Sequence, residues 1–433
     1  MLSKISRFFE LEERKTSITT EIRAGLTVYL TMAYILFVNP MILKSAGVPF
    51  NACLVGTAVA AGISSILMGV FTNFPLALAA GMGLNSMLAF NIILKHEISW
   101  QTGMGLIFLN GLTVFLLVVT GIREAVMNAI PEELKHAIAV GIGLFLAFIG
   151  FSNGGIVILN KEANILMAGN FSKPEVALTL IGFIIVSILV SLRVRGGILI
   201  GIVINTAAAV FLGIAKIPDS LISMPDFSTI GALDITGAFK LSLVPVLISF
   251  IIVDFFDTFG TVTALGYQSR LTSDSGKIKS LNKILGIDAI AAMLGGICGA
   301  SSATAYVESA AGISEGGKTG LTPITTGILF LLSIFIAPIA GIVPTQATAP
   351  ALIVIGFMMM ESIIKIKFDE YETAIPAFII FISMPFTYSI SHGIGMGFIT
   401  YCMLKITAGK AREVHPLMYA TSLVFLISFI FFN

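Results

Sequence analysis

The sequence predicts an all-α integral membrane protein that crosses the bilayer many times, as two seven-span repeats of opposite orientation. Hydrophobic residues make up 56% of the 433 residues and charged residues 11%, and the mean hydropathy is +0.99. A soluble domain carries about 25% charged residues. Apolar runs of membrane-spanning or near-spanning length recur along the whole chain, and the basic residues gather in alternate loops.

The apolar runs form a set of seven, a second set of seven and one more. The first set lies at about 25–43, 52–72, 74–94, 102–121, 136–155, 174–192 and 197–215. The second lies at about 241–265, 283–298, 300–313, 320–343, 350–364, 373–389 and 391–408, and the last run is 416–432. An odd number of spans per repeat inverts the second repeat relative to the first, an arrangement common in secondary transporters.

These runs divide the chain into five parts. We expect a cytoplasmic N-terminal segment (1–24), a first seven-span repeat (25–215), a polar linker (216–240), a second seven-span repeat (241–410) and a C-terminal hydrophobic segment (411–433). The sequence does not say whether the last segment spans the membrane. No cleavable signal peptide is expected, because the first residues are charged and of mixed sign and lack a short apolar core.

Lysine and arginine placement gives the orientation. Nineteen of the 25 basic residues fall on the side of the N-terminus, and six on the other side. Because cytoplasmic loops carry the positive excess, the N-terminus is expected in the cytoplasm. The predicted location is the plasma (inner) membrane, with lipid around a multi-pass chain.

Two aspartates lie within the apolar run of the eighth span. Asp254 and Asp257 stand in IIVDFFDTFGTVT (251–263). A carboxylate at mid-membrane depth costs several kcal/mol and tends to face a cavity, a partner or a substrate. Three positions apart on a helix, the two share one face, and Gly260 leaves that face open. The alternative is structural: one aspartate caps a broken helix or pairs with a lysine.

The third run of each repeat is short and interrupted, which is the sequence pointer to a binding site in inverted-repeat transporters. The first reads FPLALAAGMGLNSMLAF (74–90) and the second GGICGASSATAYVESAAGIS (295–314). We expect each to cross partly as extended chain, which membrane depth tolerates only beside a protein cavity. Each then continues as a half-helix whose N-terminal amides point at the midplane.

These segments and the eighth span supply the candidate ligand-binding residues. They are Asp257, Glu308, Asn85, Thr304, Tyr306, Phe256 and Gly83. The carboxylates accept hydrogen bonds, Asn85 both donates and accepts, and Phe256 can stack on a planar ligand. Asp257, Glu308 and Asp254 are the candidates for carrying a coupled ion. The structural alternatives are that Glu308 is a tolerated, protonated acid and that Asn85 ties a broken helix together.

Several classes of function are disfavoured by composition. The three cysteines and four histidines show no metal-ligand spacing, so neither a metal nor a cofactor is expected. A net charge of +1 argues against nucleic acid, and no Gly-x-x-x-x-Gly-Lys loop is present for ATP. An intramembrane hydrolase with paired aspartates is a weaker alternative, because both aspartates lie on one helix.

Six motifs resemble the AzgA-like purine permeases of the nucleobase–cation symporter superfamily. They are TMAYILFVNP (31–40), GMGLN (81–85), VDFFDTFGT (253–261), TAYVESAAG (304–312), ITTGILFLL (324–332) and AREVHPLMY (411–419). The resemblance covers nearly the whole chain. It implies a core domain and a gate domain built from the intertwined repeats, and import of adenine, guanine or hypoxanthine by proton symport through alternating access.

The resemblance also implies residue roles. The eighth-span carboxylate falls on Asp257, the tenth-span carboxylate on Glu308 and the third-span asparagine on Asn85, so Asp254 is supportive. Ser309 stands where the xanthine branch usually has asparagine, and the eighth-span acid is Asp rather than Glu, which argues against xanthine or uric acid. The superfamily often forms a homodimer through its gate domains. Sodium in place of the proton stays open.

A neighbouring alternative is an anion permease of the sulfate or bicarbonate type on the same fold. An anionic ligand would prefer arginine or lysine, whereas the candidate site carries two or three acids.

Overall fold

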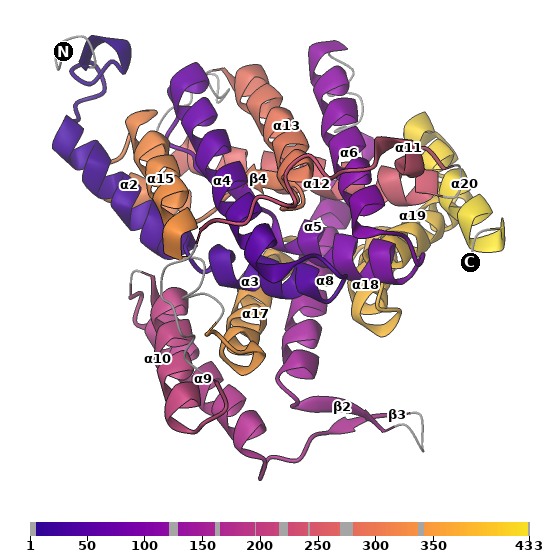
Figure 1. Ribbon diagram of the computed structural model, residues 1–433. Coiled ribbons are helices and arrows are strands. Elements are labelled where there is room, and N and C mark those ends of the chain that lie inside the picture. Colours follow the sequence, from indigo (N-terminus) through magenta and orange to yellow (C-terminus); the bar gives the residue numbers. More distant parts are fainter. Residues whose placement is uncertain are drawn as a thin grey trace.

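The computed structural model describes residues 6–120, 129–160, 165–194, 196–215, 224–240, 243–268, 280–336 and 342–431, and it is built mainly from helices (Figure 1). The apolar runs predicted from the sequence each contain a helix, or a strand followed by a helix. In the first repeat these are α2 (Ile18–Met32), α3 (Ile35–Lys44), α4 (Phe50–Thr72), β1 (Leu78–Ala80), α5 (Met82–Ser86), η1 (Met87–Leu94), α6 (Trp100–Thr120), α8 (Glu132–Asn153), α9 (Pro174–Ser191) and α10 (Gly197–Phe211).

The second repeat follows the same order. Its elements are α12 (Val244–Gln268), α13 (Leu281–Cys298), β4 (Ala303–Ala305), α14 (Ser309–Ser314), α15 (Leu321–Leu332), η3 (Ser333–Ile336), α17 (Thr345–Met359), η4 (Met360–Lys365), α18 (Tyr371–Phe386) and α19 (Ile390–Thr407). The short turn η5 (Ala411–Glu413) and α20 (Pro416–Phe431) complete the described chain. The two interrupted segments do carry short extended stretches, as the sequence predicts.

The helices form two rows. Each helix of the first repeat has a counterpart at the same position in the second repeat, and in each row the two counterparts lie at equal distances from the centre of the row. The core row runs α2, α15, α4, α13, α6 and α12, with neighbours packed side by side (Figure 1). The gate row runs α10, α9, α17, α8, α18 and α19. In both rows the symmetric centre is a pair of counterpart helices, α4 with α13 and α8 with α17. This palindromic packing is the inverted-repeat fold.

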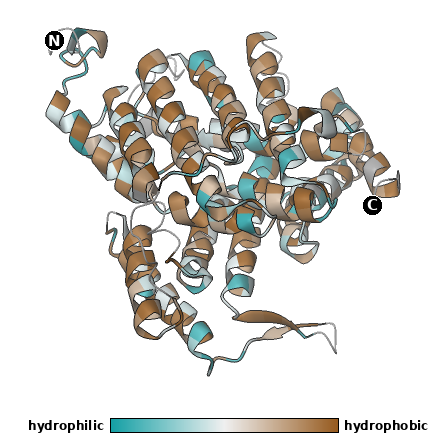
Figure 2. Ribbon diagram, in the orientation of Figure 1, coloured by the Kyte–Doolittle hydropathy of each residue, from teal (hydrophilic) through white to brown (hydrophobic). Residues whose placement is uncertain are grey.

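The apolar residues cover these helices on nearly every side (Figure 2). Among the described residues, seven helices are long and apolar enough to cross a membrane, and shorter apolar helices, such as α10, α15 and α18, accompany them. A helix that is apolar all round belongs in a core or in lipid. The polytopic membrane architecture is confirmed, and the count of fourteen spans stays a prediction.

Two features differ from the simplest expectation. α2 begins at Ile18 rather than near residue 25, because the Ser17 hydroxyl accepts a hydrogen bond from the backbone N–H of Thr20 and caps the helix. A hairpin of β2 (Val157–Asn160) and β3 (Ile165–Ala168) also follows α8. Its residues are mostly apolar and largely exposed. The hairpin was not predicted, because four residues per strand are too few for a period-two pattern to be recognised.

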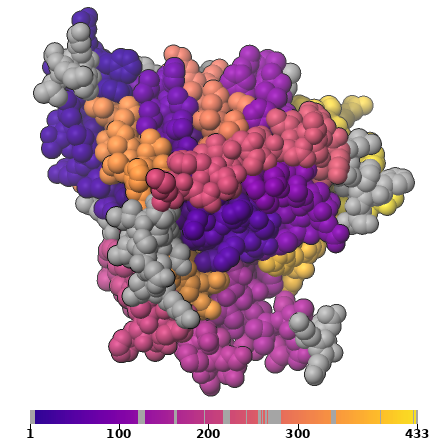
Figure 3. Space-filling model, in the orientation of Figure 1, coloured from indigo at the N-terminus to yellow at the C-terminus, as the bar shows by residue number. Residues whose placement is uncertain are grey.

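The linker lies across the core row rather than away from it. Figure 3 shows residues 224–240 as a rose-coloured band over the indigo and purple of the first repeat. Thr229 donates to the carbonyl oxygens of Ala52 and Cys298, at 3.1 and 3.0 Å. Asp234 then caps the short helix α11 (Ile235–Ala238) and accepts from the Thr102 hydroxyl of α6. The linker therefore ties α4, α13 and α6 together.

Candidate functional site

The two interrupted segments cross each other as a two-stranded antiparallel sheet. β1 pairs with β4 in the register Leu78 with Ala305, Ala79 with Thr304 and Ala80 with Ala303. Every residue of both strands is buried. An extended backbone at membrane depth needs protein partners for its N–H and C=O groups, and here each segment supplies them for the other.

Side chains reinforce this crossing. The Tyr306 hydroxyl donates to the Ala80 carbonyl at 2.6 Å, and the Ser309 hydroxyl accepts from the Ala77 N–H at 3.0 Å. Tyr306 was predicted to line a ligand site. The structure places its hydroxyl on the backbone at the end of β1, where it fixes the start of the half-helix α5.

Glu308 lies directly before α14 and is held by a tyrosine of the first span. The Tyr34 hydroxyl donates to Glu308 Oε1 at 2.6 Å. Tyr34 is fully buried at the break between α2 and α3. The two helices of the first span therefore present a hydrogen-bond donor to the tenth-span acid. Sequence reasoning missed Tyr34, although it lies in the motif 31–40.

Asp254 is buried in an unbroken helix and has two neutral donors. The Asn110 amide of α6 donates to its Oδ2 at 2.7 Å, and the Ser302 hydroxyl donates to its Oδ1 at 3.2 Å. Its side chain is 2% exposed. Its observed partners thus come from α6 and from the segment before β4, and the supportive role of Asp254 stays a prediction.

A further buried acid was missed in the sequence. Asp288 of α13 is 3% exposed and accepts from the Thr258 hydroxyl at 2.6 Å. Thr258 also lies 2.7 Å from the hydroxyl of Thr304 in β4. The candidate Thr304 is therefore joined to α12 and indirectly to α13. An acid inside the apolar run 283–298 was the signal that would have revealed Asp288.

The remaining candidates have distinct surroundings. Asn85 of α5 is fully buried, and neither its amide nitrogen nor its amide oxygen has a hydrogen-bond partner among the described residues. Gly83 faces α8, since a Cβ there would lie 2.6 Å from Ile142 Cγ2, so its small size permits close helix packing. Asp257 and Phe256 lie in α12 between Asp254 and Thr258, and their side chains lie outside the described residues.

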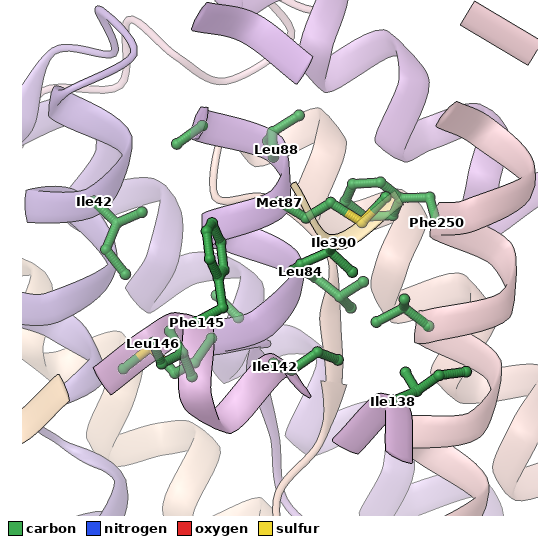
Figure 4. Close-up of a cluster of buried hydrophobic side chains, with 14 of the residues drawn as sticks. Ile42, Leu84, Met87, Leu88, Ile138, Ile142, Phe145, Leu146, Phe250 and Ile390 are labelled. Atoms are coloured by element: carbon green, nitrogen blue, oxygen red, sulfur yellow. The ribbon is translucent and has the colours of Figure 1, made fainter. Parts of the chain in front are cut away.

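The half-helix 82–94, made of α5 and η1, is sealed against the gate row. The apolar cluster around it comprises Leu84, Met87, Leu88, Ile138, Ile142, Phe145, Phe250 and Ile390 (Figure 4). At its end, the Asn91 amide donates to the Tyr388 carbonyl at 2.6 Å and accepts from the Ile390 N–H at 2.5 Å, when its nitrogen is assigned to the side facing that carbonyl. The Tyr388 ring packs edge-on against Phe90, with ring centroids 5.5 Å apart.

The counterpart half-helix α14 is less covered. It packs against α2 and α12 of the core row. The two segments can be compared two positions after each strand. Met82, the first residue of α5, is 7% exposed, whereas Val307, in the turn before α14, is 58% exposed. The crossing of β1 and β4 is therefore closed on the side of α5 and more open on the side of α14.

No cluster of three or more histidine, cysteine, aspartate or glutamate residues suited to a metal ion occurs in the part of the chain that the structure describes. Two palindromic rows around a crossing of broken segments, with buried acids held by neutral donors, are the architecture of a polytopic membrane transporter.

The chain belongs to the Permease family, whose model, Xan_ur_permease, matches residues 19–396. It is 39% identical to the adenine permease AdeQ of Escherichia coli over 427 residues, which cover 98% of this chain and 96% of that protein. It is 40% identical to the guanine/hypoxanthine permease PbuG of Bacillus subtilis over 437 residues, which cover 98% of this chain and 99% of that protein. The AzgA-like resemblance is thereby confirmed.

A solved structure shares the fold. The transmembrane domain of the cyanobacterial bicarbonate transporter BicA aligns with a TM-score of 0.62 at 15% identity, covering 95% of this chain and 96% of that one. A likeness at this level of identity concerns the fold alone.

Proposed function

We propose that the protein imports a purine nucleobase (adenine, guanine or hypoxanthine) together with a proton, by alternating access across the plasma membrane. The N-terminus lies in the cytoplasm in this proposal, and lipid surrounds the chain, as a monomer or a homodimer. The names of the relatives support the choice of substrate, since AdeQ is an adenine permease and PbuG a guanine/hypoxanthine permease.

The Asn85 side chain is the observation that carries the proposal. A buried amide without partners costs about 1–3 kcal/mol for each group left unsatisfied, and such groups in a native protein call for an explanation. A purine edge presents both N–H donors and ring-nitrogen acceptors, so it can satisfy the amide nitrogen and oxygen together. Asn85 lies on the half-helix that follows β1, beside the crossing.

The other proposed roles follow from the chemistry of a flat, neutral ligand. Glu308 and Asp257 accept from purine N–H groups, and Phe256 stacks on the ring face. Thr304, Tyr306 and Gly83 shape the crossing. In the structure the Thr304 hydroxyl contacts Thr258, the Tyr306 hydroxyl is bonded to Ala80, and Gly83 faces α8. Asp254 supports the site through its bonds to Asn110 and Ser302.

Proton coupling supplies enough free energy for accumulation. A proton that enters down 100 mV gains about 2.3 kcal/mol. Because a tenfold concentration ratio corresponds to about 1.4 kcal/mol, one proton supports roughly fortyfold accumulation of a neutral base. In the proposal Glu308 or Asp257 carries that proton, since each is a carboxyl group at membrane depth.

Alternating access is supported by the unequal exposure of the two segments where they leave the crossing of β1 and β4. With the orientation inferred from the basic residues, α5 and η1 run toward the outside and α14 toward the cytoplasm. The sealed contacts of Asn91 and Tyr388 then close the outer side, while the exposed Val307 marks the inner side. We propose that the structure corresponds to an inward-facing state. Transport requires the outer contacts to open and equivalent inner contacts to form.

The test is ligand-induced stabilisation of the purified protein. A ligand that binds only the folded state raises the free energy of unfolding by RT ln(1 + [L]/Kd). We expect adenine, guanine or hypoxanthine to raise the melting temperature, whereas xanthine, uracil, sulfate and bicarbonate do not. A shift with bicarbonate or sulfate and none with any purine would favour the anion-permease alternative. The acids Glu308 and Asp254 argue against that alternative, because their hydrogen-bond donors are neutral and an anion near two ionised acids is repelled.

A further inference from the structure

Tyr34 lies at the junction between the two helices of the first span. α2 ends at Met32 and α3 begins at Ile35, so the Tyr34 backbone lies in the turn between them. The side chain is 1% exposed, and its hydroxyl donates to Glu308 Oε1 at 2.6 Å. The helix break thus places the phenol on the carboxylate that begins α14.

The 2.6 Å separation lies in the range of a hydroxyl that donates to a carboxylate. An O–H donor on an ionised carboxylate typically lies at about 2.5–2.7 Å. The phenol makes this bond to Oε1 of Glu308. Glu308 is half-buried, and a partly desolvated carboxylate without a cation depends on such donors for its ionised form.

We infer that Tyr34 is a positioning residue for substrate and proton binding, which orients the Glu308 carboxylate and favours its ionised form until the base and the proton arrive. This inference rests on the proposed function, in which Glu308 binds the base, and it assigns the transported proton to Glu308 rather than to Asp257.

The neighbours of Glu308 are consistent with this role for Tyr34. Tyr306, two residues before Glu308, lies within hydrogen-bonding reach of the Tyr34 phenol, and its hydroxyl is bonded to the Ala80 carbonyl. α12 carries Asp254, held by Asn110 and Ser302, and Asp257, whose side chain lies outside the described residues.

The charged groups of α2 lie at the other end of α14. Glu21 accepts from the backbone N–H groups of Lys318 and Thr319 and from the Thr322 hydroxyl. Arg23 lies 3.6 Å from Glu315, the residue that follows α14. The first span therefore brings its phenol to Glu308 at one end of α14 and its ionic contacts to the other.

The first experiment compares Tyr34→Phe with Tyr29→Phe. Tyr29 provides a matched control, because its hydroxyl also lies 2.6 Å from its partner, but that partner is the neutral Ser333 hydroxyl. Purine uptake is measured against pH in proteoliposomes. Loss of a hydrogen bond to a charged group is worth about 1.5–3 kcal/mol and one pH unit about 1.4 kcal/mol. We expect the pH midpoint of uptake to rise by about one unit or more in Tyr34→Phe and to stay unchanged in Tyr29→Phe.

An unchanged midpoint in Tyr34→Phe, or an equal shift in both variants, would overturn the inference. A wild-type protein that takes up none of the three purines would overturn the proposed function instead, so the two failures are distinguishable. The melting temperatures of both variants are measured alongside, to separate altered titration from loss of folded protein.

The second experiment asks whether Tyr34 acts through Glu308. The dissociation constant of adenine, hypoxanthine or guanine, whichever binds wild type most tightly, is measured for Tyr34→Phe, Glu308→Gln and the double variant. We expect Tyr34→Phe to change the constant several-fold on its own and to add little once Glu308 is replaced. Independent, additive effects would mean that Tyr34 contacts the ligand or stabilises the fold by itself, which would contradict the positioning role.

Discussion

The Asn110 amide donates a 2.7 Å hydrogen bond to Asp254 Oδ2 and so joins α6 to α12 within the core row. Together with the Ser302 hydroxyl it allows a carboxylate to persist at 2% exposure. We expect Asn110→Leu to lower the free energy of unfolding by about 1–3 kcal/mol, because the change leaves a buried carboxyl oxygen without its donor. The measurement is thermal melting of purified protein in detergent.

Asn205→Leu is the matched control for this change. Asn205 is buried in the gate row and its amide donates at 3.0 Å to the Gln346 carbonyl, a neutral acceptor. Its replacement should cost about 0.5–1.5 kcal/mol. A melting temperature of Asn110→Leu equal to that of wild type, or a larger loss in Asn205→Leu, would argue against the importance of the bond to Asp254.

Asn85 and Asn39 form a second informative pair, since both are fully buried. Asn39 donates to the Thr57 hydroxyl at 2.8 Å and to the Ala300 carbonyl at 3.0 Å, whereas neither amide atom of Asn85 has a described partner. We expect Asn39→Ala to lower stability with little effect on purine affinity in the protein that remains folded. Asn85→Ala should weaken purine binding by about tenfold, equivalent to about 1.4 kcal/mol, with a smaller loss of stability.

Melting curves and equilibrium binding of the two variants separate these effects. The ligand-binding part proposed for Asn85 fails if Asn85→Ala binds purines as well as wild type does.

Cysteine accessibility tests the proposed inward-facing state. The three native cysteines are buried, so background labelling should be low. A cysteine at Val307 should react with a membrane-impermeant maleimide applied to the cytoplasmic face of inside-out vesicles, and a cysteine at Met82 should react slowly from either face, because their side chains are 58% and 7% exposed.

Addition of a transported purine should change the two rates in opposite directions as the populations of the states shift. Rapid labelling of the Met82 position and protection of the Val307 position before any purine is added would contradict the assigned state.

Asp234 predicts a pH dependence outside the membrane. Hydrogen bonds from the Gly237 N–H and the Thr236 hydroxyl hold the pKa of its carboxyl below the ordinary value. A depressed pKa in the folded state contributes stability above the unfolded value of about 3.9, and this contribution is lost as the pH falls through the folded pKa. We therefore expect the melting temperature of wild type to fall more steeply than that of Asp234→Asn below about pH 4. Parallel pH profiles would show that the cap does not matter.

Much of the architecture follows from local sequence properties. The apolar runs are long and their charges fall in loops, so the bilayer requirement that backbone groups be satisfied within each span leaves helix as the main solution. The interruptions of the third and tenth spans were also predictable from local sequence, since Thr304, Tyr306 and the glycines before Asn85 disfavour a continuous helix. The structure pairs these stretches as β1 and β4.

The partners of the buried acids were less predictable. Tyr34 and Glu308 are separated by 274 residues and Asn110 and Asp254 by 144. Nothing in a single sequence indicates which distant neutral side chain will meet which acid, because that depends on how the rows pack. Asp288 was overlooked since it stands alone in its span, and its link to Thr304 runs through Thr258.

The most direct test of the account is uptake of labelled adenine, guanine and hypoxanthine by proteoliposomes that contain the protein, with an imposed pH gradient, with and without a protonophore. Glu308→Gln, reconstituted at equal density, is the control. The account predicts accumulation of at least one purine by wild type, its collapse with the protonophore, and loss of gradient-driven accumulation in Glu308→Gln. Purine uptake that is indifferent to the protonophore, or that persists with full proton dependence in Glu308→Gln, would contradict it.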